Sequence, residues 1–363
     1  MAKDRSFLVI VQLKSEPRER AENQLLELSE LVGSAGGTCV GHVMAFIERP
    51  SAKSFIAQGK LAEIGAQANT YHANTIIFNV DLSPVQSRNI EAFSGIRVVD
   101  RTGLILDIFA RRAQSHAGRL QVELAQLNYL MPRLTGQGVI MSRLGGGIGS
   151  RGPGEQKLEV DRRKIRERIA RLMRELEKLR THRALLRNHR KRRDFALVAI
   201  VGYTNAGKST LLNTLTGSDV RVEDRLFVTL DPTTRAFPIP GKRQILFTDT
   251  VGFLTHLPHT LIEAFHATLE EVTEADVLIH VLDVSSSDAE HQFSAVGKVL
   301  SELGAEHCPC VLALNKVDLM DDNAKRRMME KFPSGFLISA KAKATLSPLI
   351  EAVIQKVEEI KGT

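Results

Sequence analysis

The sequence has 363 residues, of which 43% are hydrophobic and 25% are charged, and this size suits two or three globular domains. Its three cysteines are too few for a disulfide framework, no apolar run reaches the roughly 18 residues that a membrane span needs, and the N-terminus lacks a signal-peptide pattern. We therefore expect a cytoplasmic protein that acts as a monomer and has no membrane partner.

The net charge of +7 is distributed unevenly along the chain. Residues 1–150 carry a net charge of +3 and residues 194–363 carry −7, whereas residues 151–193 carry +11. Positive charges at this density repel one another unless an anion binds beside them. We therefore expect the middle segment to bind a polyanion.

Residues 1–134 predict a small α/β domain with a parallel sheet, because strand-like and helix-like runs alternate. The strand-like runs are residues 7–13, 75–80 and 96–99, and the helix-like runs are residues 19–31 and 83–93. Ser83 stands directly before Pro84, which is the order expected where a helix begins. From residue 101 onward the pattern becomes helical, with leucines on one face.

Residues 135–154 predict a loop, since eight of these twenty residues are glycine. Two interpretations remain open. The loop is a flexible linker, or its glycine-rich backbone lies against phosphates with Arg143 and Arg151 on either side. The second interpretation makes both arginines candidate RNA-binding residues.

Residues 155–193 predict a basic helical segment. Apolar residues recur with heptad spacing from Leu158 to Leu179, and Leu185 with Leu186 indicates that the segment turns back as an antiparallel helical hairpin. Its charged face is either solvated or in contact with nucleic acid, and the excess of positive charge favours nucleic acid. The candidate RNA-binding residues are Arg162, Arg163, Arg166 and Arg171.

Residues 194–363 predict a nucleotide-binding domain. An apolar strand, residues 196–201, leads directly into a P-loop and then into an apolar helix. The loop's backbone N–H groups face the phosphates, Lys208 reaches the β- and γ-phosphates as a catalytic residue, and the Ser209 hydroxyl coordinates Mg²⁺. The P-loop residues expected to bind the nucleotide are Gly202, Tyr203, Thr204, Asn205, Ala206, Gly207, Lys208, Ser209 and Thr210.

Asn205 suggests a second cation. In GTPases with the pattern Gly-x-x-Asn-x-Gly-Lys-Ser, the amide at this position helps to coordinate K⁺ beside the β- and γ-phosphates and replaces the charge of an arginine finger. The alternative is that Asn205 only caps the loop. K⁺ is therefore a candidate cofactor beside Mg²⁺.

Three later elements each follow an apolar strand and together select GTP over ATP. Asp249 holds Mg²⁺ through water, and the Gly252 N–H meets the γ-phosphate as a catalytic group. Asp318 accepts the guanine N1–H and N2–H₂ groups, which adenine lacks, and the Ala340 N–H faces guanine O6. The residues of these elements are Asp249, Thr250, Val251, Gly252, Asn315, Lys316, Val317, Asp318, Ser339, Ala340 and Lys341.

The segment 227–235 supplies the switch threonine that binds Mg²⁺. We expect Thr229 to be this metal ligand and a catalytic residue, while Thr233 and Thr234 are alternatives that spacing does not separate. The other residues of the segment expected to lie at the nucleotide are Phe227, Val228, Leu230 and Asp231.

Phe253 follows Gly252 at the position where small GTPases carry a glutamine that orients the attacking water. Neither Phe253 nor Leu254 has a hydrogen-bonding side chain. We therefore expect the protein alone to hydrolyse GTP slowly, and faster hydrolysis to require a group from outside. The alternative is that His256 or His259 takes the place of the glutamine.

With these motifs in place, the chain resembles the HflX family of translational GTPases. Residues 100–110 and 121–127 match the N-terminal domain of that family, and residues 146–163 and 229–235 contain its two hallmark stretches. The resemblance implies a ribosome-associated GTPase whose N-terminal part docks on the RNA of the large ribosomal subunit, near the peptidyl transferase region. It also implies a role in splitting or rescuing stalled ribosomes, especially under heat stress, or in subunit biogenesis.

The predicted fold class is α/β, in four parts. A smaller α/β domain (1–134) precedes the Gly-rich loop (135–154) and the basic helical hairpin (155–193), and a P-loop GTPase domain (194–363) has a mostly parallel sheet with helices on both faces. The expected reaction converts GTP to GDP and phosphate and controls docking on the large subunit. Two other functions are a structured-RNA-binding factor that uses slow hydrolysis as a timer, and an ATP-driven RNA remodeller, which Asp318 disfavours.

Overall fold

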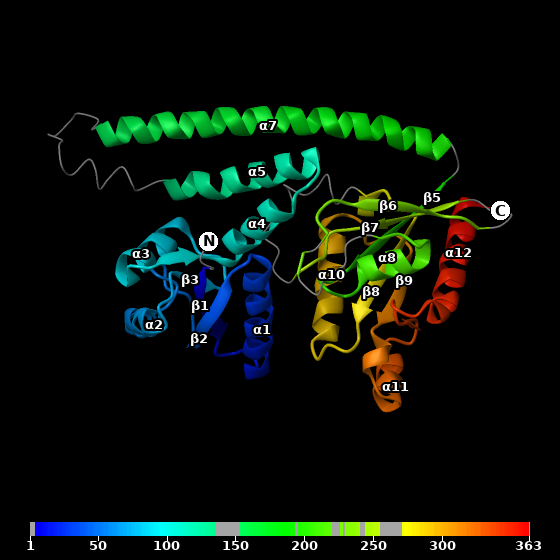
Figure 1. Ribbon diagram of the computed structural model, residues 1–363, viewed down its shortest axis with the longest axis horizontal. Helices are drawn as coiled ribbons and strands as arrows, with labels where there is room; N and C mark the ends of the chain where they lie inside the picture. The colour runs from blue at the N-terminus through cyan, green and yellow to red at the C-terminus, as the bar shows by residue number, and fades with distance from the viewer. Residues whose placement is uncertain are drawn as a thin grey trace. The chain divides into compact units, whose positions relative to one another are not determined.

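The computed structural model describes residues 4–134, 153–192, 195–219, 226–227, 229–239, 244–254 and 271–362. Contacts group the chain into two compact units. The first unit contains Met1–Arg111 and Arg119–Glu177, and the second contains Arg112–Gly118 and Lys178–Thr363. Each unit has its own sheet and its own hydrophobic core (Figure 1).

The first unit is built on a four-stranded parallel sheet with the strand order β2-β1-β3-β4. Its strands are β1 (Arg5–Leu13), β2 (Thr38–Ile47), β3 (Thr75–Phe78) and β4 (Arg97–Val99), and its connecting helices are α1 (Arg18–Ser34), α2 (Gln58–Thr70) and α3 (Pro84–Ser94). Strand β1 has neighbours on both sides and is buried from Ser6 to Gln12, so it forms the centre of the core. The predicted parallel sheet is confirmed, although the sequence pattern did not indicate β2 or α2.

Helix α3 begins where Ser83 and Pro84 predict it. The Gln86 N–H donates to Ser83 Oγ at 3.2 Å, and the Ser83 N–H donates back to Gln86 Oε1 at 2.9 Å. This reciprocal pair satisfies two backbone donors that the first turn of a helix leaves unpaired.

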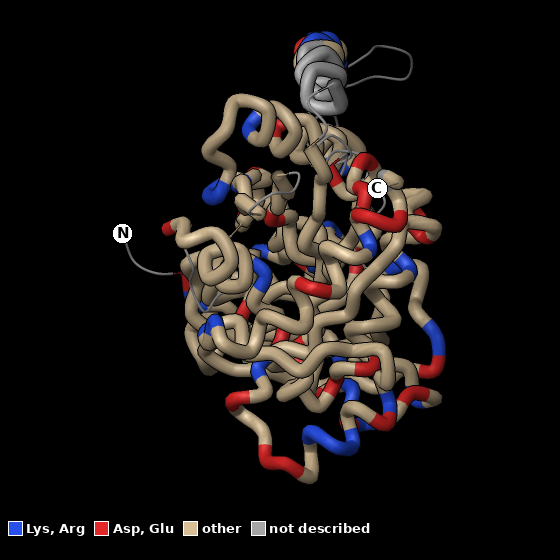
Figure 2. Tube along the Cα trace, turned by 90° about the vertical axis from the view of Figure 1, so that its right-hand side faces the viewer, with Lys and Arg blue, Asp and Glu red and all other residues tan. Residues whose placement is uncertain are grey.

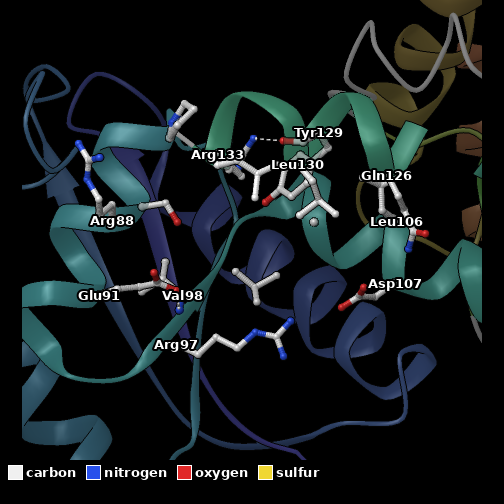
Figure 3. Close-up of a pocket in the computed structure, with 15 residues that line it drawn as sticks. Arg88, Glu91, Arg97, Val98, Leu106, Asp107, Gln126, Tyr129, Leu130 and Arg133 are labelled. Carbon is white, nitrogen blue, oxygen red and sulfur yellow. Dashed lines mark hydrogen bonds between the residues drawn. The ribbon is translucent and has the colours of Figure 1, made fainter. Parts of the chain in front are cut away.

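A buried carboxylate organises the helical end of the first unit, which contains α4 (Arg101–Arg112), α5 (His116–Leu130) and a short 3₁₀ helix (Met131–Leu134). Asp100 accepts hydrogen bonds from the Leu82 N–H (3.2 Å), the Gly103 N–H (2.8 Å), the Tyr129 hydroxyl (2.8 Å) and Arg133 Nη2 (2.7 Å). A Cβ atom on Gly103 would lie 2.7 Å from the Tyr129 hydroxyl, so this position requires glycine. Tyr129 and Arg133 line a cavity of about 330 Å³ and are joined by a further hydrogen bond (Figure 3). The contacts of the Asp100 carboxylate and the close approach of Tyr129 to Gly103 thus explain why aspartate and glycine stand at these two positions.

The basic segment is one continuous helix, α7 (Pro153–Arg192), so the predicted hairpin within residues 155–193 is wrong (Figure 1). No glycine or proline occurs between residues 155 and 192, and Leu185 and Leu186 are good helix formers, so nothing in the sequence ends the helix there. Within the first unit, α7 runs beside α5 (Figure 1). In the first unit, Arg168 of α7 donates two hydrogen bonds of 2.7 Å to the Glu123 carboxylate of α5.

The second unit contains a six-stranded sheet with the order β10-β9-β8-β5-β7-β6, in which every pair except β6–β7 is parallel. The strands are β5 (Ala196–Gly202), β6 (Thr233–Phe237), β7 (Ile245–Asp249), β8 (Val277–Asp283), β9 (Cys310–Asn315) and β10 (Phe336–Leu337). The mostly parallel sheet predicted for the GTPase domain is confirmed.

Helices cover both faces of this sheet, as predicted. They are α8 (Lys208–Thr216), α10 (Ala289–Glu302), α11 (Asp322–Lys331) and α12 (Ser347–Lys361). On β8, Val281 packs in a cluster with residues of α8 and α12, whereas the next residue, Leu282, packs in a cluster with residues of α10 and α11. Successive strand residues point to opposite faces, so the two clusters lie on opposite sides of the sheet. Among the described helices, none combines the length and apolar character needed to cross a membrane.

His280 in the middle of β8 predicts acid sensitivity. Its ring is 4% exposed and stacks on Phe293 with ring centroids 5.0 Å apart, and burial lowers its pKa from 6.5 to about 4. The folded state therefore binds this proton less readily than the unfolded state. The contribution to stability is complete well above pH 6.5 and declines as the pH falls towards 4, by roughly 2–3 kcal/mol at pH 4.5.

Denaturant unfolding at pH 7 and pH 4.5 measures this effect, with His280→Leu as the non-titrating control. The wild-type protein should lose roughly 2–3 kcal/mol more of its free energy of unfolding than the variant between the two pH values. Equal losses would show that His280 does not control the acid response.

Candidate nucleotide-binding site

The P-loop joins the end of β5 to the start of α8 in the second unit. Asn205 and Gly207 adopt positive φ angles of 61° and 97°, and a Cβ atom on Gly207 would overlap the Asn315 amide, so glycine is required there. Lys208 is buried, and its Nζ atom donates to Gly202 O (3.2 Å) and Tyr203 O (2.8 Å). Burial lowers the pKa of Lys208 to about 8, with Asp249 acting in the opposite direction. An anionic phosphate beside this ammonium group would stabilise its charged form.

Three side-chain oxygens meet beside the P-loop. Ser209 Oγ lies 2.6 Å from Asp249 Oδ2 and 3.0 Å from Thr229 Oγ1, which is 3.1 Å from the same carboxylate oxygen. Asp249 Oδ1 is buried and accepts no hydrogen bond from the described residues, and burial raises the pKa of this carboxyl. A carboxylate and two hydroxyls are the hard oxygen ligands that Mg²⁺ prefers, and a cation there would stabilise the ionised carboxylate. These residues therefore fit a magnesium ion.

The other two threonines of the switch segment begin β6. Thr233 is the register partner of Asp249 in the antiparallel β6–β7 pair, and Thr234 Oγ1 lies 2.9 Å from the Thr248 hydroxyl of β7. Of the three hydroxyls, that of Thr229 is the one whose hydrogen bonds to both Ser209 and Asp249 are seen among the described residues.

The residues after β7 are bound closely to the P-loop. The Thr204 N–H donates to Phe253 O at 2.8 Å, and the Phe253 N–H donates to Gly202 O at 3.1 Å. A Cβ atom on Gly252 would lie 2.7 Å from the Thr204 side chain and 3.0 Å from Lys208 Nζ, so the Gly252 backbone closely approaches the Lys208 ammonium group. The Phe253 side chain is fully buried. It is therefore enclosed by other protein atoms.

The base-recognition elements converge on the opposite side of the P-loop. Asn315 Nδ2 donates to Ala206 O (2.7 Å), and Asn315 Oδ1 accepts from the Ala340 N–H (2.8 Å), so one buried amide joins three loops. Asp318 is exposed, and its hydrogen bond with Ser339 holds the pKa of its carboxyl below the ordinary value. An ionised, accessible carboxylate is what guanine recognition requires.

Asp283 is a site residue that sequence reasoning missed. It ends β8, and its carboxylate pairs with Lys316 Nζ at 2.6 Å while accepting from the Ser285 N–H (3.0 Å) and hydroxyl (2.6 Å). Lys316 itself adopts a positive φ of 68°. The signal was present, because Asp283 follows an apolar strand in the same way as Asp249 follows β7.

The remaining candidates are placed as follows. Phe227, Leu230 and Val251 are buried, Thr250 Oγ1 donates to Ile200 O (2.7 Å), and the Asp231 carboxylate accepts from Gln114 and Ser115. On α7, Arg163, Arg166 and Arg171 are exposed and Arg162 is half-buried. The candidates that lie outside the described residues are Arg143, Arg151, Val228, His256 and His259.

Comparisons with known proteins cover most of the chain. Residues 22–110 match the family "GTP-binding GTPase N-terminal", residues 112–190 match "GTP-binding GTPase Middle Region", and residues 197–316 match "50S ribosome-binding GTPase". The chain is 49% identical over 357 residues to GTPase HflX of Caldanaerobacter subterraneus, which spans 97% of this chain and 81% of that protein. It is 41% identical over 341 residues to GTPase HflX of Escherichia coli, which spans 93% of this chain and 80% of that protein.

A solved structure is similar over the length of the chain. The complex of SsGBP with GDP superposes with a TM-score of 0.53 at 27% identity and covers 98% of this chain and 99% of that one. The P-loop, the converging Ser209, Thr229 and Asp249, and the base-recognition loops are the parts that hydrolysis of a guanine nucleotide needs. On this evidence, the chain belongs to the HflX family of GTPases.

Proposed function

We propose that this GTPase associates with the large ribosomal subunit and its RNA, and that GTP hydrolysis controls this association during the splitting or rescue of stalled ribosomes or during subunit biogenesis. The observation that carries the proposal is the match of residues 197–316 to 50S ribosome-binding GTPases. The exposed arginines of α7, in a segment with a net charge of +11, provide a surface for RNA phosphates.

In the nucleotide site, the P-loop N–H groups and Lys208 bind the phosphates, and the Gly252 N–H binds the γ-phosphate. Ser209 and Thr229 would hold Mg²⁺ directly and Asp249 would hold it through water, and the ion would supply positive charge beside the phosphates. Asn315 positions the P-loop against the Ala340 N–H, and this arrangement supports recognition of guanine O6. Asp318 accepts the N–H groups of the base.

Cosedimentation of the full chain with separated ribosomal subunits tests this function. We expect the protein to pellet with large subunits in the presence of a non-hydrolysable GTP analogue and to be released in GDP. Tight binding to structured RNA that ignores the nucleotide would instead favour the RNA-binding factor with a hydrolysis timer. No association with large subunits in any nucleotide state would contradict the proposal.

The arginines of α7 are expected to carry the phosphate contacts. Arg166→Glu combined with Arg171→Glu should weaken binding to large subunits and reduce the slope of log K against log salt by about one unit for each lost contact, with GTP affinity unchanged. The matched control is Arg326→Glu with Arg327→Glu, which reverses two exposed arginines on α11. An unchanged slope in the α7 variant, or an equal change in the control, would show that the α7 arginines are only solvated.

We also expect K⁺ to accelerate hydrolysis through Asn205. Asn205 lies in the P-loop at a positive φ of 61°, and a carboxamide oxygen is a suitable ligand for a cation beside the phosphates. Hydrolysis rates in K⁺ and in Na⁺ at matched ionic strength measure this effect. Asn205→Gly tolerates the backbone conformation and removes the amide, so it should abolish the difference. Equal wild-type rates in the two salts would exclude the role.

A further inference from the structure

The carboxylate of Asp231 is bound by a segment far away in the sequence. Its Oδ2 atom accepts from the Gln114 N–H (3.1 Å) and the Ser115 N–H (2.8 Å), and its Oδ1 atom accepts from the Ser115 hydroxyl. Ser115 Oγ in turn accepts from the Gly118 N–H at 2.9 Å. Three donors on one carboxylate form a charge-assisted cluster, which is stronger than neutral hydrogen bonds. Both carboxylate oxygens are therefore turned towards this segment of the chain.

The segment that binds Asp231 connects α4 to α5. Residues Arg112–Gly118 belong by their contacts to the second unit, whereas the residues immediately before and after them belong to the first. The contact is tightly fitted, because a Cβ atom on Gly118 would lie 2.5 Å from Asp231 Oδ1. The start of α5 is thus built around the carboxylate, where the helix dipole also favours a negative charge.

Asp231 is two residues from Thr229, whose hydroxyl lies 3.1 Å from Asp249 Oδ2 and 3.0 Å from Ser209 Oγ. Two residues span at most about 7 Å, so Thr229 does not move far while Asp231 stays bound. Leu230 between them is buried and restricts the segment further.

We propose that Asp231 is a positioning residue that holds Thr229 at the metal site by binding Gln114 and Ser115. The contact is made in the GTP state and is released when Thr229 leaves the site after hydrolysis. The nucleotide state is thereby transmitted to the connection between α4 and α5, whose neighbours on both sides belong to the N-terminal unit. This inference rests on the proposed role of Thr229 as a metal ligand.

The first test compares nucleotide affinities of the full chain in Mg²⁺. Asp231→Ala should weaken binding of the GTP analogue GMPPNP by about tenfold and leave GDP affinity unchanged, because only the triphosphate state uses Thr229. Asp321→Ala is the matched control, since the Asp321 carboxylate also accepts a backbone N–H (Ala324, 2.7 Å) in the same unit. An equal loss for both nucleotides would show that Asp231 has only a structural role.

Gly118→Ala disrupts the same contact, but the change is made in the α4–α5 connection instead of at Asp231. The added methyl group displaces the Asp231 carboxylate, while alanine is a better helix former than glycine and does not weaken α5. It should therefore reproduce the selective loss of GMPPNP affinity. Combined with Asp231→Ala, it should add nothing further, because both changes remove one interaction. Additive effects would overturn the proposal.

Hydrogen exchange of the Gln114 and Ser115 amides provides the direct readout. We expect both amides to exchange about tenfold more slowly with GMPPNP than with GDP in the wild-type protein, and equally fast in both states in Asp231→Ala. Should the protein bind both nucleotides with Mg²⁺ while these amides exchange at the same rate in GMPPNP and GDP, the proposed link from Thr229 through Asp231 is wrong, but the GTPase site is unaffected. If GMPPNP binding does not depend on Mg²⁺ or on Thr229, the metal-site assignment itself fails.

Discussion

Asp318→Asn is expected to convert guanine selectivity into xanthine selectivity. The carboxylate is exposed, and its hydrogen bond with Ser339 lowers its pKa, so it is ionised at neutral pH and accepts two guanine N–H groups. An asparagine presents one acceptor and one donor. The donor opposes guanine N2–H₂ and pairs with the carbonyl oxygen that xanthine carries at the same position.

The expected size of this change is large. A site whose polar groups are left unpaired by the wrong ligand discriminates by roughly 10⁴–10⁵, so GDP affinity should fall by a factor approaching this range while XDP binding appears. Direct titration with GDP and XDP measures both effects. Asp322→Asn, a neighbouring exposed aspartate on α11, is the matched control and should change neither affinity.

Two outcomes would contradict the assignment of the base site. One is an Asp318→Asn protein that keeps its preference for GDP over XDP. The other is a wild-type protein that binds ATP as tightly as GTP, because adenine offers no N–H pair to Asp318. Either result would mean that the contacts of Asn315 with Ala206 and Ala340 serve packing alone.

The nucleotide site was largely predictable because its signals are local. Each element is a few residues long and follows an apolar strand, and parallel strands bring their carboxyl ends to one edge of a sheet. The choice among Thr229, Thr233 and Thr234 was not predictable in this way. It depends on how the chain between α8 and β6 folds back on Asp249, and spacing does not encode that path.

The first unit was predicted less completely, for physical reasons. Strand β2 is an edge strand with a mostly half-exposed burial pattern, and Gly41 and His42 interrupt its first half, so only the run of residues 43–47 marks it as apolar. The hairpin prediction failed because a heptad pattern indicates that a helix packs on another helix without saying which. The true partner of α7 is α5, and the Arg168–Glu123 pair joins residues 45 apart.

In the nucleotide-binding unit, Asp231 likewise makes a contact with a distant part of the sequence that could not be predicted. Its place in the switch segment indicated a nucleotide contact, whereas its carboxylate accepts from Ser115, 116 residues earlier in the chain. No local pattern predicts a contact at that separation.

Large ribosomal subunits are expected to accelerate GTP hydrolysis by this protein by roughly 10³–10⁵, the range that a group supplied from outside provides in other GTPases. The structural reason is the residue after Gly252. The Phe253 side chain is fully buried and its backbone is bound to Gly202 and Thr204, so it neither offers a hydrogen-bonding group nor has freedom to swing towards water. Leu254 is also buried.

Within the described residues, the site therefore stabilises charge without aligning the attacking water. In the proposed site, Lys208 and the Gly252 N–H bind the phosphates, and Ser209, Thr229 and Asp249 fit the metal. These groups would lower the barrier, but the nucleophile would still have to be oriented. We therefore expect slow intrinsic hydrolysis.

Single-turnover kinetics on the full chain, with and without purified large subunits, measures the acceleration, and small subunits serve as the control. The competing explanation is that His256 or His259, which lie outside the described residues, orients the water. It predicts fast hydrolysis by the isolated protein, no increase with large subunits, and loss of activity in His256→Ala or His259→Ala. A slow isolated enzyme that only large subunits accelerate, with both histidine variants retaining that acceleration, would establish that the ribosome completes the site that Phe253 leaves open.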